Sequence, residues 1–214
     1  MRYTRKTRRA RSRAQRLALT VLALAALAGC FYYYTHRGVP GAGVEIPEWI
    51  TQELLPLNPN SRPGTPLEKI DGVVVHYVGN PATSAAANRG YFANLALTNE
   101  TKASAHFIVG LEGEILQCVP LTEIAYCSNQ ANSHTVSIEV CHPDSTGEFT
   151  PETVESLERL VAWLCVTFRL DADAVIRHYD VTGKICPKFY VENPERWAAF
   201  LEDVRLRAAE ERKK

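Results

Sequence analysis

The sequence has no excess charge of either sign and no internal repeat. Its 24 Lys and Arg residues balance 24 Asp and Glu residues over 214 positions, and the missing repeat excludes a solenoid or a propeller. Apolar residues make up 46% and charged residues 22% of the chain. This composition excludes wholesale disorder and allows a buried core. The length suits one domain of ordinary size behind a short targeting segment.

Acidic residues are missing from the N-terminus. Residues 1–16 contain eight Lys or Arg and no Asp or Glu, so the rest of the chain is net acidic. A free basic arm of this kind can bind nucleic acid. The segment that follows it argues against that interpretation, and we expect no nucleic-acid partner.

Residues 17–34 contain no charged residue. Eighteen uncharged positions are roughly enough to cross a bilayer as a helix. Basic residues precede the segment and three tyrosines, 32–34, end it, which is the positive-inside pattern with an aromatic belt. We therefore predict four parts: a basic cytoplasmic tail (1–16), a transmembrane signal anchor (17–34), a linker (35–55) and an extracytoplasmic domain (56–208). The domain is expected on the outer side of the cell membrane.

A tetrapeptide inside this segment leaves another possibility. Leu27-Ala28-Gly29-Cys30 resembles the bacterial lipobox, where a signal peptidase cuts before a Cys that is then lipidated. The bulky aromatic residues after Cys30 are unlike the flexible tether usual at such a site. An uncleaved anchor, a lipoprotein held by a lipid on Cys30 and a cleaved, released form all place the domain outside the cytoplasm. Disulfides are allowed there, but spacing does not choose between pairings and free buried thiols for Cys118, Cys127, Cys141 and Cys165.

Strand and helix signals alternate along the outer domain. Residues 35–66 are rich in Pro and Gly and predict a linker and entry loop, with a helical turn within 44–55. Strands are predicted at 73–77, 106–109, 115–119 and 136–141. Helices are predicted to begin at Thr83-Ser84, at Thr150-Pro151-Glu152 and at Asn193-Pro194-Glu195. Strands interleaved with helices over one sheet predict an α/β fold with a mixed central sheet.

Histidine is scarce, since the chain has six. His76 ends the first predicted strand, and His178 begins the stretch RHYDVTGKICPKFY, which also holds Lys184 and Cys186. Two imidazoles and a thiolate make a tetrahedral zinc site with one position left for water. We predict one zinc ion per chain at this site.

Glu139 lies on the strand VSIEVC, where Val136, Ile138 and Val140 share one face and Glu139 lies on the other. A charged residue among apolar ones needs a partner or a task. The simpler alternative is a structural ion pair, for example with Arg177. A solvent-facing loop lysine is likewise the simpler alternative for Lys184.

These motifs resemble the type 2 N-acetylmuramoyl-L-alanine amidases, which are related to peptidoglycan recognition proteins. The similarity runs in order through NPNSRPGTPL (58–67), VVVHYVGNP (73–81), ASAHFIVGLEGEILQCVPLTEIAY (103–126), VSIEVCHP (136–143) and HYDVTGKICP (178–187). The resemblance implies a single domain with a mixed central sheet flanked by helices and a zinc-bearing groove. It also implies that the chain hydrolyses the amide bond between N-acetylmuramic acid and L-alanine in peptidoglycan.

By this resemblance, His76, His178 and Cys186 match the zinc ligands, Lys184 matches the lysine that stabilises the oxyanion, and Glu139 matches the acid/base. Two positions depart from the family. Ala105 stands where some members carry a catalytic Tyr, and Cys127-Ser128-Asn129 replaces the usual His-containing turn. Candidate substrate contacts are Tyr77, His106, Asn129 and Thr182, although His106 also suits a structural role.

Two other functions remain possible from the sequence. The first is a non-catalytic peptidoglycan-binding module on the same fold, which loss of a zinc ligand would mark. The second is a thiol hydrolase that uses Cys186 as nucleophile and His178 as base. The second function leaves His76 and Glu139 without a role.

Overall fold

The computed structural model describes residues 15–16, 18–29 and 38–213. They fall into two units, divided between Gly38 and Val39, and residues 18–29 of the first unit are helical. Among the described residues, no helix combines the length and apolar character needed to span a membrane. Most of the basic tail and residues 17 and 30–34 of the expected anchor, including Cys30, lie outside these ranges. Membrane anchoring therefore stays a prediction.

The second unit is built on a six-stranded mixed sheet. The β3–β4 pair is antiparallel, whereas the β1–β4, β3–β5, β2–β5 and β2–β6 pairs are parallel. The expected α/β fold with a mixed central sheet is thus confirmed. In spatial order the strands are β1 (Thr51–Gln52), β4 (Ile115–Gln117), β3 (Phe107–Val109), β5 (Thr135–Val140), β2 (Gly72–Val75) and β6 (Val175–Arg177).

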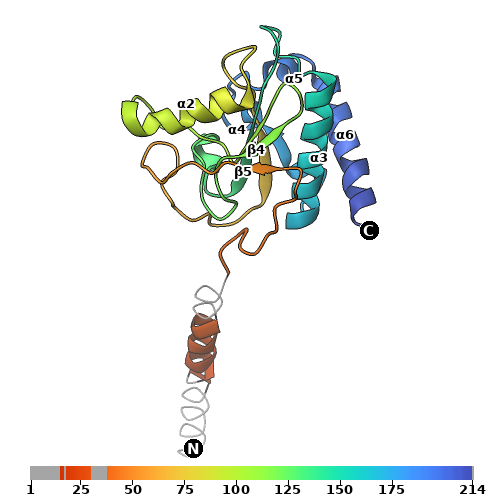
Figure 1. The fold of residues 1–214 in the computed structure, drawn as a ribbon. Coiled ribbons are helices and arrows are strands. Elements are labelled where there is room, and N and C mark those ends of the chain that lie inside the picture. Colours follow the sequence, from red (N-terminus) through yellow and green to blue (C-terminus); the bar gives the residue numbers. More distant parts are fainter. Residues whose placement is uncertain (1–14, 17, 30–37, 214) are drawn as a thin grey trace, which may run out of the picture. The chain divides into compact units, whose positions relative to one another are not determined.

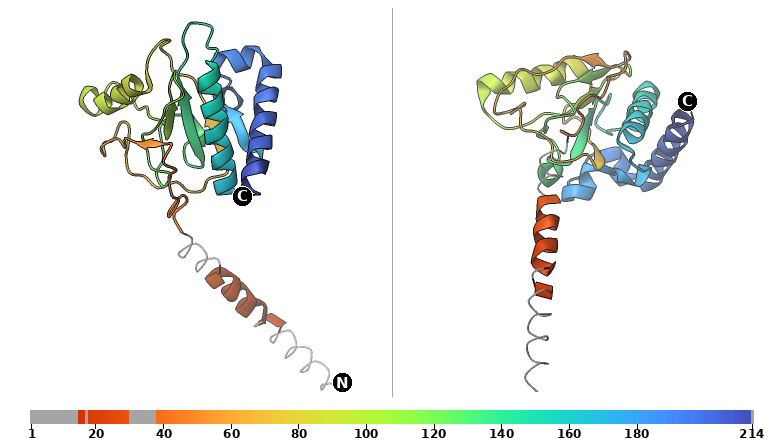
Figure 2. Two further views of the ribbon diagram at one scale, coloured as in Figure 1. Left: turned by 45° about the vertical axis from the view of Figure 1, so that its right-hand side comes forward. Right: turned by 90° about the horizontal axis from the view of Figure 1, so that it is seen from below.

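Helices cover both faces of this sheet. Helices α3 (Pro151–Phe168) and α6 (Pro194–Glu211) lie side by side on one face, and α2 (Ala85–Thr98) lies on the other (Figures 1 and 2). Two apolar clusters fill the layers, one beneath α3 and α6 and one beneath α2. Shorter helical segments connect the layers: η1 (Asn129–Ala131), η2 (Ala172–Ala174), α4 (His178–Thr182) and α5 (Lys188–Glu192).

Side chains alternate along β5 as its sequence predicts. Val136, Ile138 and Val140 belong to the cluster beneath α3 and α6, while Cys141 belongs to the cluster beneath α2. Glu139 therefore points to the α2 side of the sheet, because successive strand residues face opposite sides.

Local signals set the helix starts. The Ser84 Oγ accepts a hydrogen bond from the Ala87 N–H at 3.2 Å, and the Thr150 Oγ1 accepts one from the Thr153 N–H at 3.1 Å. These caps satisfy N–H groups that the first helical turn leaves free. Gly113, with φ of 81°, turns the chain from β3 to β4. The predicted helix starts at Ser84 and Thr150 and this hairpin are confirmed.

One boundary prediction is wrong. The segment 44–55 contains a turn in which the Ile50 N–H donates to the Pro47 carbonyl at 2.9 Å, and after it the edge strand β1, paired with Leu116 and Gln117 of β4. Leu55 is buried in the core beneath α2, so the compact unit begins before residue 56, within the segment expected to be a linker. The partners of this segment lie about 60 positions away in the chain, so the local sequence does not predict the pairing.

The stretch after Arg177 forms the two short helices α4 and α5, joined by residues 183–187. The Asp180 carboxylate accepts a hydrogen bond from the Arg177 backbone N–H at 2.8 Å, which starts α4, and Gly183 with φ of 78° ends it. The two short helices carry His178 into the site and bring the chain back past Cys186.

Candidate metal centre

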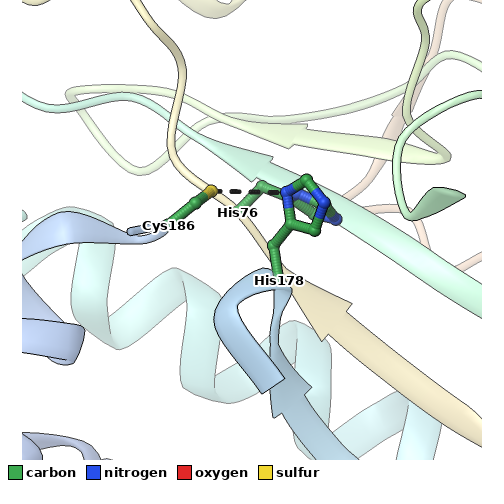
Figure 3. A group of neighbouring side chains, drawn as sticks. All are labelled: His76, His178 and Cys186. Atoms are coloured by element: carbon green, nitrogen blue, oxygen red, sulfur yellow. Dashed lines mark hydrogen bonds between the residues drawn. The ribbon is translucent and has the colours of Figure 1, made fainter. Parts of the chain in front are cut away.

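His76, His178 and Cys186 meet beyond the carboxyl ends of two neighbouring parallel strands. His76 follows β2 directly and His178 follows β6, and these strands pair with Val75 opposite Arg177. Figure 3 shows the three side chains converging, with the Cys186 Sγ 3.9 Å from the His76 Nδ1. One ligand atom from each residue lies within 4.8 Å of the other two. The parallel register thus assembles three metal-ligand types from distant parts of the chain.

The outer nitrogen of each imidazole has a partner in one turn of the chain. The His76 Nε2 lies 2.9 Å from the Ser128 Oγ, and the His178 Nε2 lies 2.9 Å from the Asn129 Oδ1. An amide oxygen only accepts hydrogen bonds, so the His178 Nε2 donates and its Nδ1 keeps a lone pair. Such outer partners are typical of metal-binding histidines, whose tautomer they fix.

The His178 Nδ1 is buried and has no hydrogen-bond partner among the described residues. A buried polar atom without a partner is costly and calls for an explanation. The pKa of His76 is held well below its usual value by burial and by the nearby His178 and Lys184. Burial and Lys184 also lower the pKa of His178. Neutral rings with free lone pairs are what a metal ion requires, and the donor set fits zinc.

The environment of Cys186 is unfavourable for a nucleophilic thiol. Burial, with a contribution from Glu139, raises the pKa of Cys186 to about 12. Nucleophilic cysteines have a lowered pKa, because the thiolate is the reactive form. The hydrogen-bond partner of its Sγ is His76, whereas the thiol-hydrolase alternative requires His178 as the base. The arrangement suits a thiol that loses its proton to a bound metal.

Glu139 lies beside this centre. One of its carboxylate oxygens is within 4.8 Å of a ring nitrogen of His76 and of the Cys127 Sγ. Burial raises the pKa of Glu139 to about 8, against the lowering effects of the Cys127 hydrogen bond and of Lys184. The simpler alternative, an ion pair with Arg177, is wrong because Arg177 binds Asp180 through two hydrogen bonds of 3.0 and 2.8 Å.

Lys184 is exposed and lies in the chain between α4 and Cys186. Its positive charge contributes to lowering the pKa values of Glu139 and of both histidines. The ammonium group is therefore close enough to act on charge that develops at the centre. Its exposed position in a loop is also what the simpler alternative expects, so a role for Lys184 at the centre stays a prediction.

The four candidate substrate contacts lie in different environments. His106 is 0% exposed: its Nδ1 accepts from the Ser137 N–H at 3.0 Å and its Nε2 donates to the Glu123 carbonyl at 2.9 Å. Tyr77 is half-buried, packs against the cluster beneath α3 and α6 and has its ring centroid 5.0 Å from that of His142. His106 is thus held in the interior, and a substrate contact by Tyr77 stays a prediction. Asn129 and Thr182 are exposed; Asn129 contacts the His178 ring, and the Thr182 Oγ1 donates to the His178 carbonyl at 3.3 Å.

The turn Cys127-Ser128-Asn129 contributes more to the site than its sequence indicates. Asn132 fixes it, because the Asn132 Oδ1 accepts hydrogen bonds from the backbone N–H groups of Cys127 at 3.1 Å and Ser128 at 2.6 Å. The sequence analysis assigned no role to Ser128 or Asn132. The short polar stretch after Tyr126 indicated a turn, but its sequence does not show that the turn contacts His76 and His178.

The structure leaves the cysteines Cys118, Cys127, Cys141, Cys165 and Cys186 as free thiols.

Comparisons with known proteins find relatives of this chain in fold and in sequence. The catalytic domain of XlyA superposes with a TM-score of 0.62 at 26% identity, over 72% of this chain and 98% of that one. The amidase CwlL of Bacillus licheniformis is 32% identical over 168 residues, which cover 72% of this chain and 46% of that protein. The amidase BlyA of Bacillus subtilis strain 168 is 32% identical over 178 residues, covering 73% and 47%. The chain spans about half the length of these curated relatives.

Residues 66–189 match the protein family described as N-acetylmuramoyl-L-alanine amidase. The matched range includes His76, Glu139, His178, Lys184 and Cys186, and so it contains the whole centre described above. The chain belongs to the type 2 N-acetylmuramoyl-L-alanine amidase family.

Proposed function

We propose that this chain hydrolyses the amide bond between N-acetylmuramic acid and L-alanine in peptidoglycan, with one zinc ion held by His76, His178 and Cys186. The observation that carries the proposal is the buried, partnerless Nδ1 of His178 beside His76 and Cys186. The curated relatives named as amidases of this type support the choice of substrate.

A zinc ion bound there supplies a Lewis acid that polarises the amide carbonyl and lowers the pKa of a bound water. Glu139 takes a proton from the attacking water and later gives it to the departing amine of L-alanine. A carboxyl group whose pKa is raised to about 8 by burial can do both near neutral pH, because the best acid/base has a pKa close to the working pH. The products are a glycan strand and a free stem peptide.

Lys184 acts on the oxyanion that forms when water adds to the carbonyl. Its ammonium is a fixed positive charge near the centre, and a donor of this kind is worth roughly 2.7–4 kcal/mol of barrier in hydrolases. The Asn129 Oδ1, which only accepts, holds the His178 imidazole in the tautomer that leaves its Nδ1 free, and the Ser128 hydroxyl holds the His76 ring through its Nε2.

The test is the release of new amino termini from purified peptidoglycan by the zinc-loaded full chain. We expect free stem peptides that begin with L-alanine, no release after chelation, and release again when zinc is restored. The Glu139→Gln variant should bind zinc and wall material but hydrolyse about 10²- to 10⁴-fold more slowly. A wild type that binds peptidoglycan and releases no alanine terminus would be a binding module, and full activity in chelator would exclude the zinc mechanism.

We further propose that residues 1–34 tether the domain on the outer side of the cell membrane, where its substrate lies. The basic tail and the uncharged segment that follows it support this. In intact cells, added protease should then degrade the domain, and carbonate washing should leave the full chain with the membranes. The Cys30→Ser variant separates the two modes, because it should release a lipoprotein and leave a helical anchor in place. A full chain found in the soluble cytoplasmic fraction would contradict the proposal.

A further inference from the structure

Cys127 begins the turn whose next two residues contact His76 and His178. Its Sγ lies 3.5 Å from the Glu139 Oε1, and this Sγ and one oxygen of the Glu139 carboxylate lie within 4.8 Å of a His76 ring nitrogen. The thiol thus lies beside the proposed acid/base and beside one metal ligand without belonging to the three-ligand set.

The direction of this hydrogen bond follows from the chemistry of the two groups. An ionised carboxylate has only acceptor sites, and a thiol carries one weak donor. The S–H of Cys127 therefore donates to the Glu139 Oε1 whenever Glu139 is ionised. Because the backbone N–H of Cys127 is itself bound to the Asn132 Oδ1, the donor is held by a turn that is fixed at its start.

The two oxygens of Glu139 differ as a result. The Oε1 has the thiol as its partner, whereas the Oε2 is buried and has no partner among the described residues. A hydrogen bond to one oxygen limits rotation of the carboxylate plane and leaves the other oxygen to exchange a proton.

Building on the proposed function, we infer that Cys127 is a positioning residue. Its S–H holds the Glu139 Oε1 so that the Oε2 is the oxygen that takes and returns the proton. Cys127 acts only through Glu139, and it neither binds the metal nor touches the substrate.

Kinetics of the zinc-loaded full chain test this role. Cys127→Ala should lower kcat about 5- to 10-fold, the loss expected for one weak hydrogen bond to a charged group. The KM and the zinc content should stay within about 2-fold of wild type, because neither substrate nor metal contacts are removed. Cys127→Ser keeps an O–H donor and should recover most of the lost kcat. The matched control is Cys165→Ala, a buried thiol in α3, which should leave kcat unchanged.

A double-mutant cycle separates this role from a structural one. In a Glu139→Gln background, Cys127→Ala should cause no further loss beyond about 2-fold, because the group through which the thiol acts is already gone. An unchanged kcat in Cys127→Ala, a Cys127→Ser variant as slow as Cys127→Ala, or equal losses in both backgrounds would overturn the inference.

Infrared spectroscopy gives a readout that does not depend on activity. The difference spectrum between wild type and Cys127→Ser isolates the S–H stretching band of Cys127. The Glu139→Ala substitution removes the acceptor and should move this band to higher frequency, whereas Glu112→Ala on the exposed turn after β3 should not. A band insensitive to Glu139 refutes the inference even if the chain is an amidase. A shifted band with no hydrolysis of peptidoglycan refutes the proposed function and leaves the contact standing.

Discussion

Ionisation of Glu139 should lower the free energy of unfolding of the metal-free protein at neutral and higher pH. Burial raises the pKa of Glu139 from its usual 4.5 to about 8, so the folded state holds this proton more tightly than the unfolded state does. The free energy of unfolding therefore falls as pH rises from about 4.5 through about 8. Glu139→Gln cannot ionise and is free of this dependence.

The magnitude follows from the two pKa values. Each pKa unit corresponds to ~1.4 kcal/mol, and integrating between pH 5 and pH 9 gives a change of about 4 kcal/mol in favour of Glu139→Gln relative to wild type. A constant offset between the proteins is expected because a buried amide replaces a carboxyl. The diagnostic quantity is the growth of the difference with pH.

Urea unfolding of the full chain in chelator at pH 5, 7 and 9 measures this difference. Tryptophan fluorescence reports the transition, since Trp197 and Trp163 lie in or against the core beneath α3 and α6. Glu112→Gln, on the exposed turn after β3, is the matched control and should follow wild type at every pH. A difference that stays constant from pH 5 to pH 9, or a Glu139→Gln variant that loses stability as pH rises, would refute the reasoning.

Substitutions at three further positions test other parts of the structure. Cys186→Asp should keep zinc and measurable activity because a carboxylate oxygen binds zinc at ~2.0–2.2 Å, whereas Cys186→Ala should lose both by metal analysis and alanine release. Asn132→Ala should weaken zinc binding about 10-fold in a chelator competition, since outer-shell support is lost, while Asn132→Asp keeps the acceptor oxygen and should stay near wild type. Arg62→Ala should lower the free energy of unfolding by about 2 kcal/mol, because Arg62 makes two largely buried hydrogen bonds of 2.8 and 2.7 Å to Glu123. Arg62→Lys should recover only part of this loss in urea unfolding, and an unchanged midpoint in either variant would contradict that ion pair's role.

The parts of the fold that could be predicted from the sequence are those set by near neighbours. Ser84 and Thr150 begin helices through hydrogen bonds that reach three residues along the chain. Alternation along β5 placed Glu139 on the face opposite Val136, Ile138 and Val140 before any contact was known. Both kinds of signal act within a few residues, and both predictions are confirmed.

The predictions that failed depended on distant partners. Strand β1 exists because β4 offers it an edge. His106 suited a substrate contact by its place at a strand start, yet the Ser137 N–H and the Glu123 carbonyl hold both of its nitrogens in the interior. The residue types and their spacing in the sequence predicted the three metal ligands. They could not show that the turn 127–129 holds the two imidazoles.

The order of the strands also affects when the protein becomes able to act. His76 and Cys186 are 110 positions apart in the chain, and β6, which carries His178 into place, lies at the edge of the sheet. A ribosome delivers His76 long before β6, and parallel pairing of such distant segments is slow to form. A chain stopped before residue 175 has one of the three ligands and lacks the edge strand β6. If the protein cuts peptidoglycan, interrupted translation products cannot, so a cell that exports this chain is exposed to its activity only after synthesis is nearly complete.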